Sequence, residues 1–160
     1  MSRLDSFMRR LEAQRACLNW ACERIAGLSG VVLGLGLGNG RSYDHLRERL
    51  GTARAIYVFD RQLAAHPDCA PPPDRLLLGE LRQTLPGFAA GPVALAHADL
   101  GTGDAQASAA LARWLGPVLA PLLAPGGLVL SDQPLCGPRL SVLVLPAPIQ
   151  AGRYFAYRRT

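Results

Sequence analysis

Three glycines at alternating positions form the most informative pattern of the sequence. Gly36, Gly38 and Gly40 occupy a predicted turn directly after the apolar segment VVLGL at residues 31–35. Glycines in such a turn let the backbone approach a ligand closely and present N–H groups at the start of the next helix. A dinucleotide fingerprint needs glycines at i, i+2 and i+5, and no register of this turn supplies the third. The turn therefore predicts a ligand site with a different glycine spacing.

Titratable residues stand at the ends of two further apolar segments. Asp60 ends the expected strand 55–59, and His97 follows the expected strand 93–96. The carboxyl ends of parallel strands meet at one edge of a sheet, where folds of this kind bind ligands. Histidine titrates near neutral pH, so His97 is the best-placed general base, with a hydrogen-bonded structural histidine as the alternative. We therefore expect a polar site beside the glycine turn.

Alternating helices and strands must position these residues. Helices are expected over 3–27, over 41–50, and over 104–123 as far as its prolines, with Pro125-Gly126-Gly127 as the stop. Strands are expected at 31–35, 55–59, 76–78, 93–96, 128–131, 140–145 and 154–158. This order predicts a doubly wound α/β fold with a mostly parallel seven-stranded sheet. We expect one domain over residues 1–160, with an N-terminal helix within 1–27 and the sheet within 31–160.

Composition excludes several classes of protein. Of 160 residues, 49% are hydrophobic and 18% are charged, which is incompatible with intrinsic disorder. The longest apolar window is about 15 residues and contains prolines, whereas a membrane-spanning helix needs about 20. All 17 basic residues are arginine, so a P-loop and chemistry on lysine are excluded. Four cysteines without a CxxC pair predict a reduced, cytoplasmic protein.

The charge pattern argues against a nucleic-acid partner. The formal net charge is +5, but the arginines are scattered in runs of at most two. Aromatic residues make up 6% of the chain and do not alternate with basic patches, as a single-strand platform would require. A small-molecule ligand is the better expectation.

The glycine turn and the segments that follow it resemble the class I S-adenosylmethionine-dependent methyltransferases over residues 31–158. That family has an apolar strand running into GxGxG, as in VVLGLGLGNG, and an acidic residue closing the next strand, as does Asp60 in AIYVFD. The segments LLLGEL and LLAPGGLVLSD match its later motifs. The resemblance implies the Rossmann-like methyltransferase fold, S-adenosylmethionine as cofactor and methyl transfer as the reaction.

The resemblance also implies a set of site residues. Asp60 would accept hydrogen bonds from both ribose hydroxyls, and Glu80 and Leu81 would lie beside the adenine. The implied cofactor-binding residues are Gly36, Gly38, Asn39, Gly40, Tyr43, Asp60, Glu80, Leu81 and His97, and the catalytic candidates are His97 and Asp99. The family usually has an acid two residues before the first glycine, where it contacts the methionine amino group, and here Gly34 stands there. Asp99 or a backbone carbonyl would have to replace it.

The acceptor of the methyl group is only partly restricted. The chain lacks the Asn/Asp-Pro-Pro-aromatic motif of exocyclic and amide nitrogen methylation, and the Pro-Cys nucleophile of cytosine methylation. Catechol-type relatives hold a metal with acids at places that match Asp99 and Asp132, but Asp132 serves equally well as a loop cap, so we predict no metal site. Two rival hypotheses stay open: a non-catalytic binding module, and a nicotinamide dinucleotide-binding protein.

The C-terminal half predicts self-association. Seven residues separate Asp132 from Leu140, fewer than the dozen or so that a helical crossover needs. The helices of this half should be reduced and its apolar strands thinly covered, which favours a homo-oligomer. The alternative is that the N-terminal helix folds back over the bare face of its own sheet.

Overall fold

The computed structural model describes residues 1–160 and contains the following elements. They are α1 (Arg3–Arg24), β1 (Val31–Leu35), α2 (Arg41–Leu50), β2 (Ile56–Asp60), the 3-10 turns η1 (Pro67–Cys69) and η2 (Pro73–Arg75), β3 (Leu76–Leu78), α3 (Leu81–Thr84), β4 (Val93–Ala98), α4 (Ala105–Leu122), β5 (Leu123–Ser131), β6 (Leu140–Leu143) and β7 (Phe155–Arg159). The predicted β1, β3 and α2 have the same bounds in the structure.

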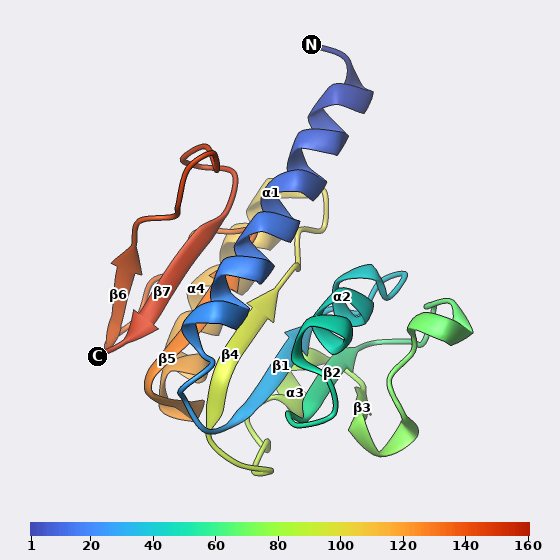
Figure 1. Cartoon of the computed structure of the whole chain (residues 1–160), viewed down its shortest axis with the longest axis vertical. Helices are drawn as coiled ribbons and strands as arrows, with labels where there is room; N and C mark the ends of the chain where they lie inside the picture. The colour runs from blue at the N-terminus through green and yellow to red at the C-terminus, as the bar shows by residue number, and fades with distance from the viewer.

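The seven strands form one sheet in the order β3-β2-β1-β4-β5-β7-β6 (Figure 1). The first five strands pair in parallel, and β7 is antiparallel to both β5 and β6. Residues of β4 are buried along its whole length, as expected for a central strand covered on both faces. The predicted doubly wound, mostly parallel seven-stranded fold is confirmed.

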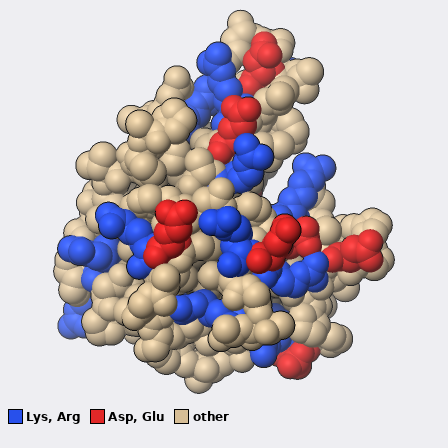
Figure 2. All heavy atoms as spheres, in the orientation of Figure 1, with Lys and Arg blue, Asp and Glu red and all other residues tan.

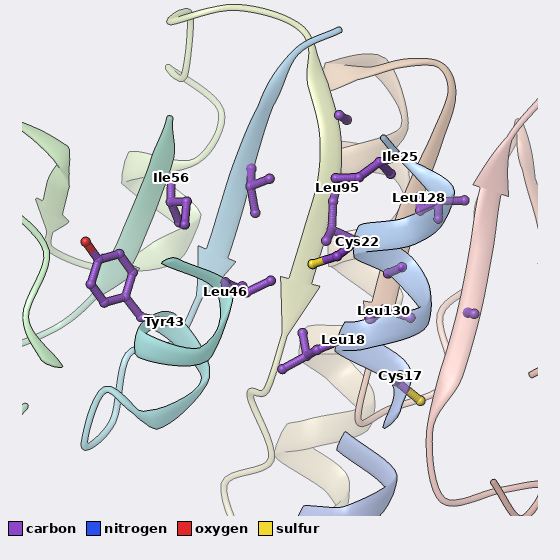
Figure 3. Close-up of a cluster of buried hydrophobic side chains, with 14 of the residues drawn as sticks. Cys17, Leu18, Cys22, Ile25, Tyr43, Leu46, Ile56, Leu95, Leu128 and Leu130 are labelled. Carbon is purple, nitrogen blue, oxygen red and sulfur yellow. The ribbon is translucent and has the colours of Figure 1, made fainter. Parts of the chain in front are cut away.

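Helices cover the sheet on both faces. Helices α1 and α2 lie on one face, and α3 and α4 lie on the other (Figure 1). Figure 3 shows Leu18, Cys22 and Ile25 of α1 packed toward Leu95 of β4 and Leu128 of β5. The C-terminal half of α1 therefore folds back over its own sheet, which was the alternative to self-association.

Helix α4 differs from the sequence-based expectation. It was expected to run only as far as its prolines, but it includes both Pro117 and Pro121, and β5 already begins at Leu123, ahead of the expected Pro-Gly-Gly stop. The two prolines stand one turn apart on the exposed side of the helix, where water can satisfy the carbonyls that lose a partner. Burial of Leu115 and Leu119 on the opposite side keeps the helix continuous.

The segment between β5 and β6 contains no helix, as predicted. The backbone of this segment packs directly on α4. At Gly116 the two backbones are so close that a Cβ atom would lie 2.0 Å from the carbonyl oxygen of Cys136. The edge strand β6 is thinly covered, and Val142 is 77% exposed. Among the helices, α1 and α4 cover the C-terminal half of the sheet, and loop residues such as Leu135 and Ile149 pack beside them.

The first turns of α1 project beyond the sheet (Figure 1). A capping box fixes the helix start: the Ser2 hydroxyl accepts from the Asp5 N–H, and the Asp5 carboxylate accepts from the Ser2 N–H. Leu4, Phe7 and Met8 are 66%, 44% and 51% exposed on this segment. None of the helices has the length and apolar character needed to cross a membrane.

Candidate active site

A cleft of about 330 Å³ opens at the carboxyl ends of β1, β2 and β4. The turn after β1 contributes Gly36 and Gly38 to its wall, β2 contributes Asp60, and the segment after β4 contributes Asp99 and Leu100. Glu80 and Leu81, at the start of α3, complete the side next to β2. Of the two titratable residues that the sequence placed at this edge of the sheet, Asp60 therefore lines the cleft and His97 does not.

The three glycines of the turn differ in what surrounds them. All three have positive φ, at +92° for Gly36, +53° for Gly38 and +89° for Gly40. A Cβ at Gly36 would lie 2.8 Å from the carbonyl oxygen of Asp99, and one at Gly40 would lie 2.4 Å from that of Cys69. A Cβ at Gly38 would meet nothing within 4 Å. The packing of the chain itself thus requires Gly36 and Gly40, whereas Gly38 borders open space in the cleft.

Asp60 is held by the backbone of the glycine turn and of its own loop. One carboxylate oxygen accepts from the N–H groups of Leu37 (2.8 Å) and Gly38 (3.1 Å), and the other accepts from the N–H of Arg61 (2.6 Å). Burial by itself would raise the pKa of Asp60, but these backbone hydrogen bonds outweigh it and hold the pKa below its ordinary value. The residue is an oriented anion whose fourth backbone bond, from the Gln62 N–H, is long at 3.5 Å, so a ligand hydroxyl would compete at that position.

Glu80 and Leu81 form the outer side of the cleft. The Glu80 carboxylate lies 3.3 Å from the Nε atom of Arg61, in an exposed ion pair. Leu81 is half-buried and begins α3, a short helix that the sequence did not predict. Together they present an apolar wall beside an acidic group.

Asp99 is held by side chains from a distant part of the chain. Its carboxylate accepts a hydrogen bond from Gln14 Nε2 of α1 at 2.8 Å, and Arg10 Nη1 lies 3.6 Å away. The Asp99 side chain is 29% exposed and lines the cleft. Helix α1 therefore forms part of the support of this side of the site.

A buried histidine and tyrosine continue this network. His97 Nε2 and the Tyr154 hydroxyl share a hydrogen bond of 2.5 Å, and that hydroxyl also lies 3.4 Å from Gln14 Nε2. His97 is 1% exposed. Burial lowers the pKa of His97 to about 4, although Asp99 acts in the opposite direction, so the imidazole is neutral at pH 7. The structure shows the hydrogen-bonded histidine that the sequence left as the alternative.

Asp132 caps a loop. Its carboxylate oxygens accept from the N–H groups of Leu100 (3.1 Å) and Gly101 (2.9 Å), and burial raises its pKa. No group of three or more His, Cys, Asp or Glu side chains in the chain is arranged to hold a metal ion. Asp132 thus shapes the segment that carries Asp99 and Leu100.

Several predicted cofactor residues do not line the cleft. Tyr43 is buried in the core between α2 and β2 (Figure 3), because its ring lies on the inner side of α2. Gly40 packs on Cys69 of η1 and on Ala65 before it, and the Asn39 side-chain oxygen accepts from the N–H of Arg41 at 3.3 Å. The His97 side chain lies below the cleft surface. In this structure these four residues contact the segments around the cleft and do not form its wall.

The sequence analysis did not identify Gln14, Arg10 or Tyr154 as residues of the site. Gln14 is 85 residues from Asp99 and 140 from Tyr154, so no local spacing connects them. The one available signal was the position of Gln14 on the side of the amphipathic helix that also carries Cys17, Leu18 and Ala21. A polar residue on that side requires a polar partner.

The family model described as S-adenosyl-L-methionine methyltransferase matches residues 1–159. A crystal structure of an S-adenosyl-L-methionine methyl transferase from Silicibacter pomeroyi DSS-3 is 46% identical, with a TM-score of 0.92 over 100% of this chain and 99% of that one. No protein of curated function matches the chain significantly.

More distant structures share the fold. Calicheamicin methyltransferase CalS11 is 17% identical, with a TM-score of 0.61 over 90% of this chain and 77% of that one. Cofactor-bound Rv0187 from MTB is also 17% identical, with a TM-score of 0.59 over 97% of this chain and 89% of that one. The full-length family match and the close structural relative decide between the hypotheses drawn from the glycine turn. The chain belongs to the S-adenosyl-L-methionine methyltransferase family and is an S-adenosylmethionine-dependent methyltransferase.

Proposed function

We propose that the chain transfers the methyl group of S-adenosylmethionine to a small-molecule acceptor in the cleft beside β1. The observation that carries this proposal is the pairing of Gly38, which borders open space, with the oriented carboxylate of Asp60 in one cleft. A backbone without a side chain admits a ligand at close range, and the carboxylate accepts from its hydroxyl groups.

The cofactor contacts follow the order of the strands. Asp60 would accept from the ribose hydroxyls, and Glu80 and Leu81 would lie beside the adenine. Asp60 ends β2 and Asp99 follows β4, so the two carboxylates flank β1 from opposite sides. An elongated cofactor that contacts both would lie across the glycine turn.

Asp99 is our candidate for the anchor of the methionine amino group. Gly34 stands where the family usually has an acid, and it carries no group that could bind an ammonium. Asp99 lies next to the turn, since its carbonyl oxygen is 2.8 Å from the Cβ position of Gly36, and the residue lines the cleft. A partly buried carboxylate beside an ammonium group is a favourable charge-assisted pair.

Methyl transfer requires the protein mainly to position the cofactor and the acceptor. The cofactor supplies a methyl group on a sulfonium; the carbon–sulfur bond breaks as the acceptor's lone pair binds the carbon, and a neutral thioether leaves. The chain aligns the two reactants and excludes water. Because Asp99 would be paired with the amino group, a proton lost by the acceptor would leave to solvent as the product is released, and neutral His97 would act through Tyr154 as a positioning residue.

Isothermal calorimetry with S-adenosylmethionine and with NAD(H) tests the proposal. We expect saturable binding of S-adenosylmethionine and none of NAD(H). Absence of S-adenosylmethionine binding at millimolar concentration would overturn the assignment of this cleft. Transfer of labelled methyl groups to a panel of small molecules, with RNA as a comparison, then tests the acceptor class. Figure 2 supports a small molecule, because basic side chains on the face shown are separated by acidic and uncharged ones.

Although the C-terminal half of α1 covers its own sheet, the first turns of α1 and β6 keep exposed apolar side chains, and from these we also propose that the protein is a homo-oligomer in the cytoplasm. Leu4, Phe7 and Met8 on the projecting end of α1 are exposed, as is Val142 on β6, and a second copy would bury such apolar side chains. All four cysteines are free, which suits a reducing compartment. Light scattering at micromolar concentration tests the oligomer: a mass near 17.1 kDa would contradict it.

A further inference from the structure

Arg10 places a positive charge beside the proposed anchor of the cofactor's amino group. Its Nη1 atom lies 3.6 Å from one carboxylate oxygen of Asp99, and Gln14 Nε2 donates to the other oxygen. Arg10 and Gln14 are four residues apart on α1, so they lie on the same side of the helix. Because α1 continues past the carboxyl ends of the strands (Figure 1), this side of the helix reaches Asp99 just beyond the end of β4.

The ion pair between Arg10 and Asp99 does little for the fold. Their side chains are 48% and 29% exposed, and 3.6 Å is too long for a hydrogen bond. Exposed pairs of this kind contribute little to stability. The guanidinium therefore keeps its five N–H donors for another acceptor. The ring of Phe7, one turn earlier, has its centroid 5.8 Å from Arg10 Cζ and favours this position of the guanidinium.

A cation at this place acts on any ammonium group that binds Asp99. Arg10 by itself would repel the ammonium, whereas an anion placed next to both positive charges would attract them. The amino-acid end of S-adenosylmethionine carries such an anion, since its amino group and its carboxylate are bonded to the same carbon. Asp99 and Arg10 are likewise adjacent and opposite in charge. The pair is therefore complementary to the zwitterionic end of the cofactor.

We propose that Arg10 binds the carboxylate of the cofactor's methionine portion while Asp99 binds its amino group. A guanidinium can bind a carboxylate with two parallel N–H···O bonds, which fixes its orientation as well as its position. Helix α1 then recognises the amino-acid end of the cofactor, and Asp60 recognises the ribose on the other side of β1. This inference rests on the proposed function, because it needs the cofactor in the cleft at β1.

Decarboxylated S-adenosylmethionine is the probe that separates binding from positioning. It keeps the amino group and the sulfonium and lacks only the carboxylate. Calorimetry on the full chain compares it with S-adenosylmethionine. We expect Arg10→Gln to weaken S-adenosylmethionine about tenfold, because a charge-assisted pair is lost, and to change the affinity of the analogue less than twofold. Arg10→Lys keeps the charge without the forked geometry, so its loss should be intermediate.

Arg9→Gln is the matched control. It removes the same charge from the adjacent residue of α1, but Arg9 faces residues 148–153 and not Asp99. We expect both ligands to bind this variant within twofold of their affinity for the wild type. A loss in Arg9→Gln as large as that in Arg10→Gln would show that the net charge of the helix is responsible, and would contradict a direct contact.

The same titrations distinguish this inference from the proposed function. If Arg10→Gln weakens both ligands equally, Arg10 only positions Asp99, and the carboxylate contact is overturned. An unchanged affinity for S-adenosylmethionine in Arg10→Gln overturns it as well. In both cases the proposed function stands, because the wild type still binds the cofactor. If the wild type binds no S-adenosylmethionine, the proposed function fails, and the role of Arg10 fails with it.

Discussion

Two carboxylates line the same cleft and are held in opposite ways. Asp60 accepts hydrogen bonds from the backbone N–H groups of Leu37 and Gly38 in the glycine turn, which the pairing of β1 with β2 brings beside it, and of its neighbour Arg61. Asp99 is held by side chains of Gln14 and Arg10, which reach it from a helix that begins the chain. Backbone groups of the glycine turn hold one side of the site, and side chains of α1 hold the other.

This difference determines how each side should respond to change. Backbone donors cannot be removed by a side-chain substitution, so Asp60 keeps its orientation in almost every variant that folds. The position of Asp99 depends on where α1 lies and on the hydrogen bonds of Gln14 and Tyr154. We therefore expect substitutions on the Asp60 side to act directly on the ligand, and substitutions on the Asp99 side to act through neighbours.

Gly38→Val should have the largest effect. The side chain would occupy the open space beside the turn, and S-adenosylmethionine affinity should fall more than a hundredfold. The positive φ of +53° adds a strain of about 1–2 kcal/mol in a non-glycine residue. Gly126→Val is the matched control, since it has φ +78° and open space but lies at the start of β5. Calorimetry that shows unchanged affinity in folded Gly38→Val would mean that the turn is only structural.

As the pH falls, the part of the site around Asp99 and His97 should lose its contribution to folding stability at a higher pH than the part around Asp60. The pKa of His97 falls from 6.5 to about 4 on folding because of burial, so the unfolded chain binds the proton more tightly. Its stabilising contribution is complete above pH 6.5 and is lost as the pH falls from 6.5 toward 4, by roughly 3 kcal/mol. Asp60 also has a lowered pKa, and its contribution is lost only at still lower pH, below its ordinary value of 3.8.

Urea unfolding at pH 7 and pH 4.5 measures this loss. His97→Gln retains a hydrogen-bonding side chain that does not titrate, and it should abolish most of the difference between the two pH values. His66→Gln, in an exposed loop, should leave the difference intact. An equal pH dependence in the wild type and in His97→Gln would show that another group is responsible.

Asp60→Ala should reduce S-adenosylmethionine affinity about tenfold to a hundredfold. The estimate follows from a hydrogen bond to a charged group, about 1.5–3 kcal/mol. Asp74→Ala removes a carboxylate from the exposed turn η2 and should leave affinity unchanged. A change of less than twofold in folded Asp60→Ala would contradict the ribose assignment.

The same contrast explains which parts of the molecule the sequence could predict. Strand β1, helix α2 and Asp60 follow from contiguous patterns: a buried apolar run, glycines, and an acid that ends the next strand. The bonds of Asp99 to Gln14 and of His97 to Tyr154 join residues 85 and 57 positions apart, and only the packing of α1 and β7 brings them together. The continuation of α4 through Pro117 likewise depends on burial of its opposite side, which local propensity does not contain.

Asp99→Asn should weaken S-adenosylmethionine binding about tenfold, because the amide keeps the shape of the side chain but removes its charge. S-adenosylhomocysteine, which has the same amino group, should lose affinity equally. A cofactor analogue without the amino group should bind the wild type and the variant alike. If all three ligands lost the same affinity in Asp99→Asn, Asp99 would not be the residue that binds the amino group.

Gln14→Leu should have the smallest effect and tests whether α1 positions Asp99. The substitution keeps the volume of the side chain and removes the 2.8 Å hydrogen bond to the Asp99 carboxylate, while Asp99 itself remains. One partly exposed hydrogen bond contributes about 0.5–1 kcal/mol, so cofactor affinity should fall roughly twofold to fivefold. The double variant Gln14→Leu/Asp99→Asn should bind no more weakly than Asp99→Asn alone, because Gln14 then has no carboxylate to orient. Additive losses in this cycle, measured by calorimetry, would show that Gln14 acts independently of Asp99.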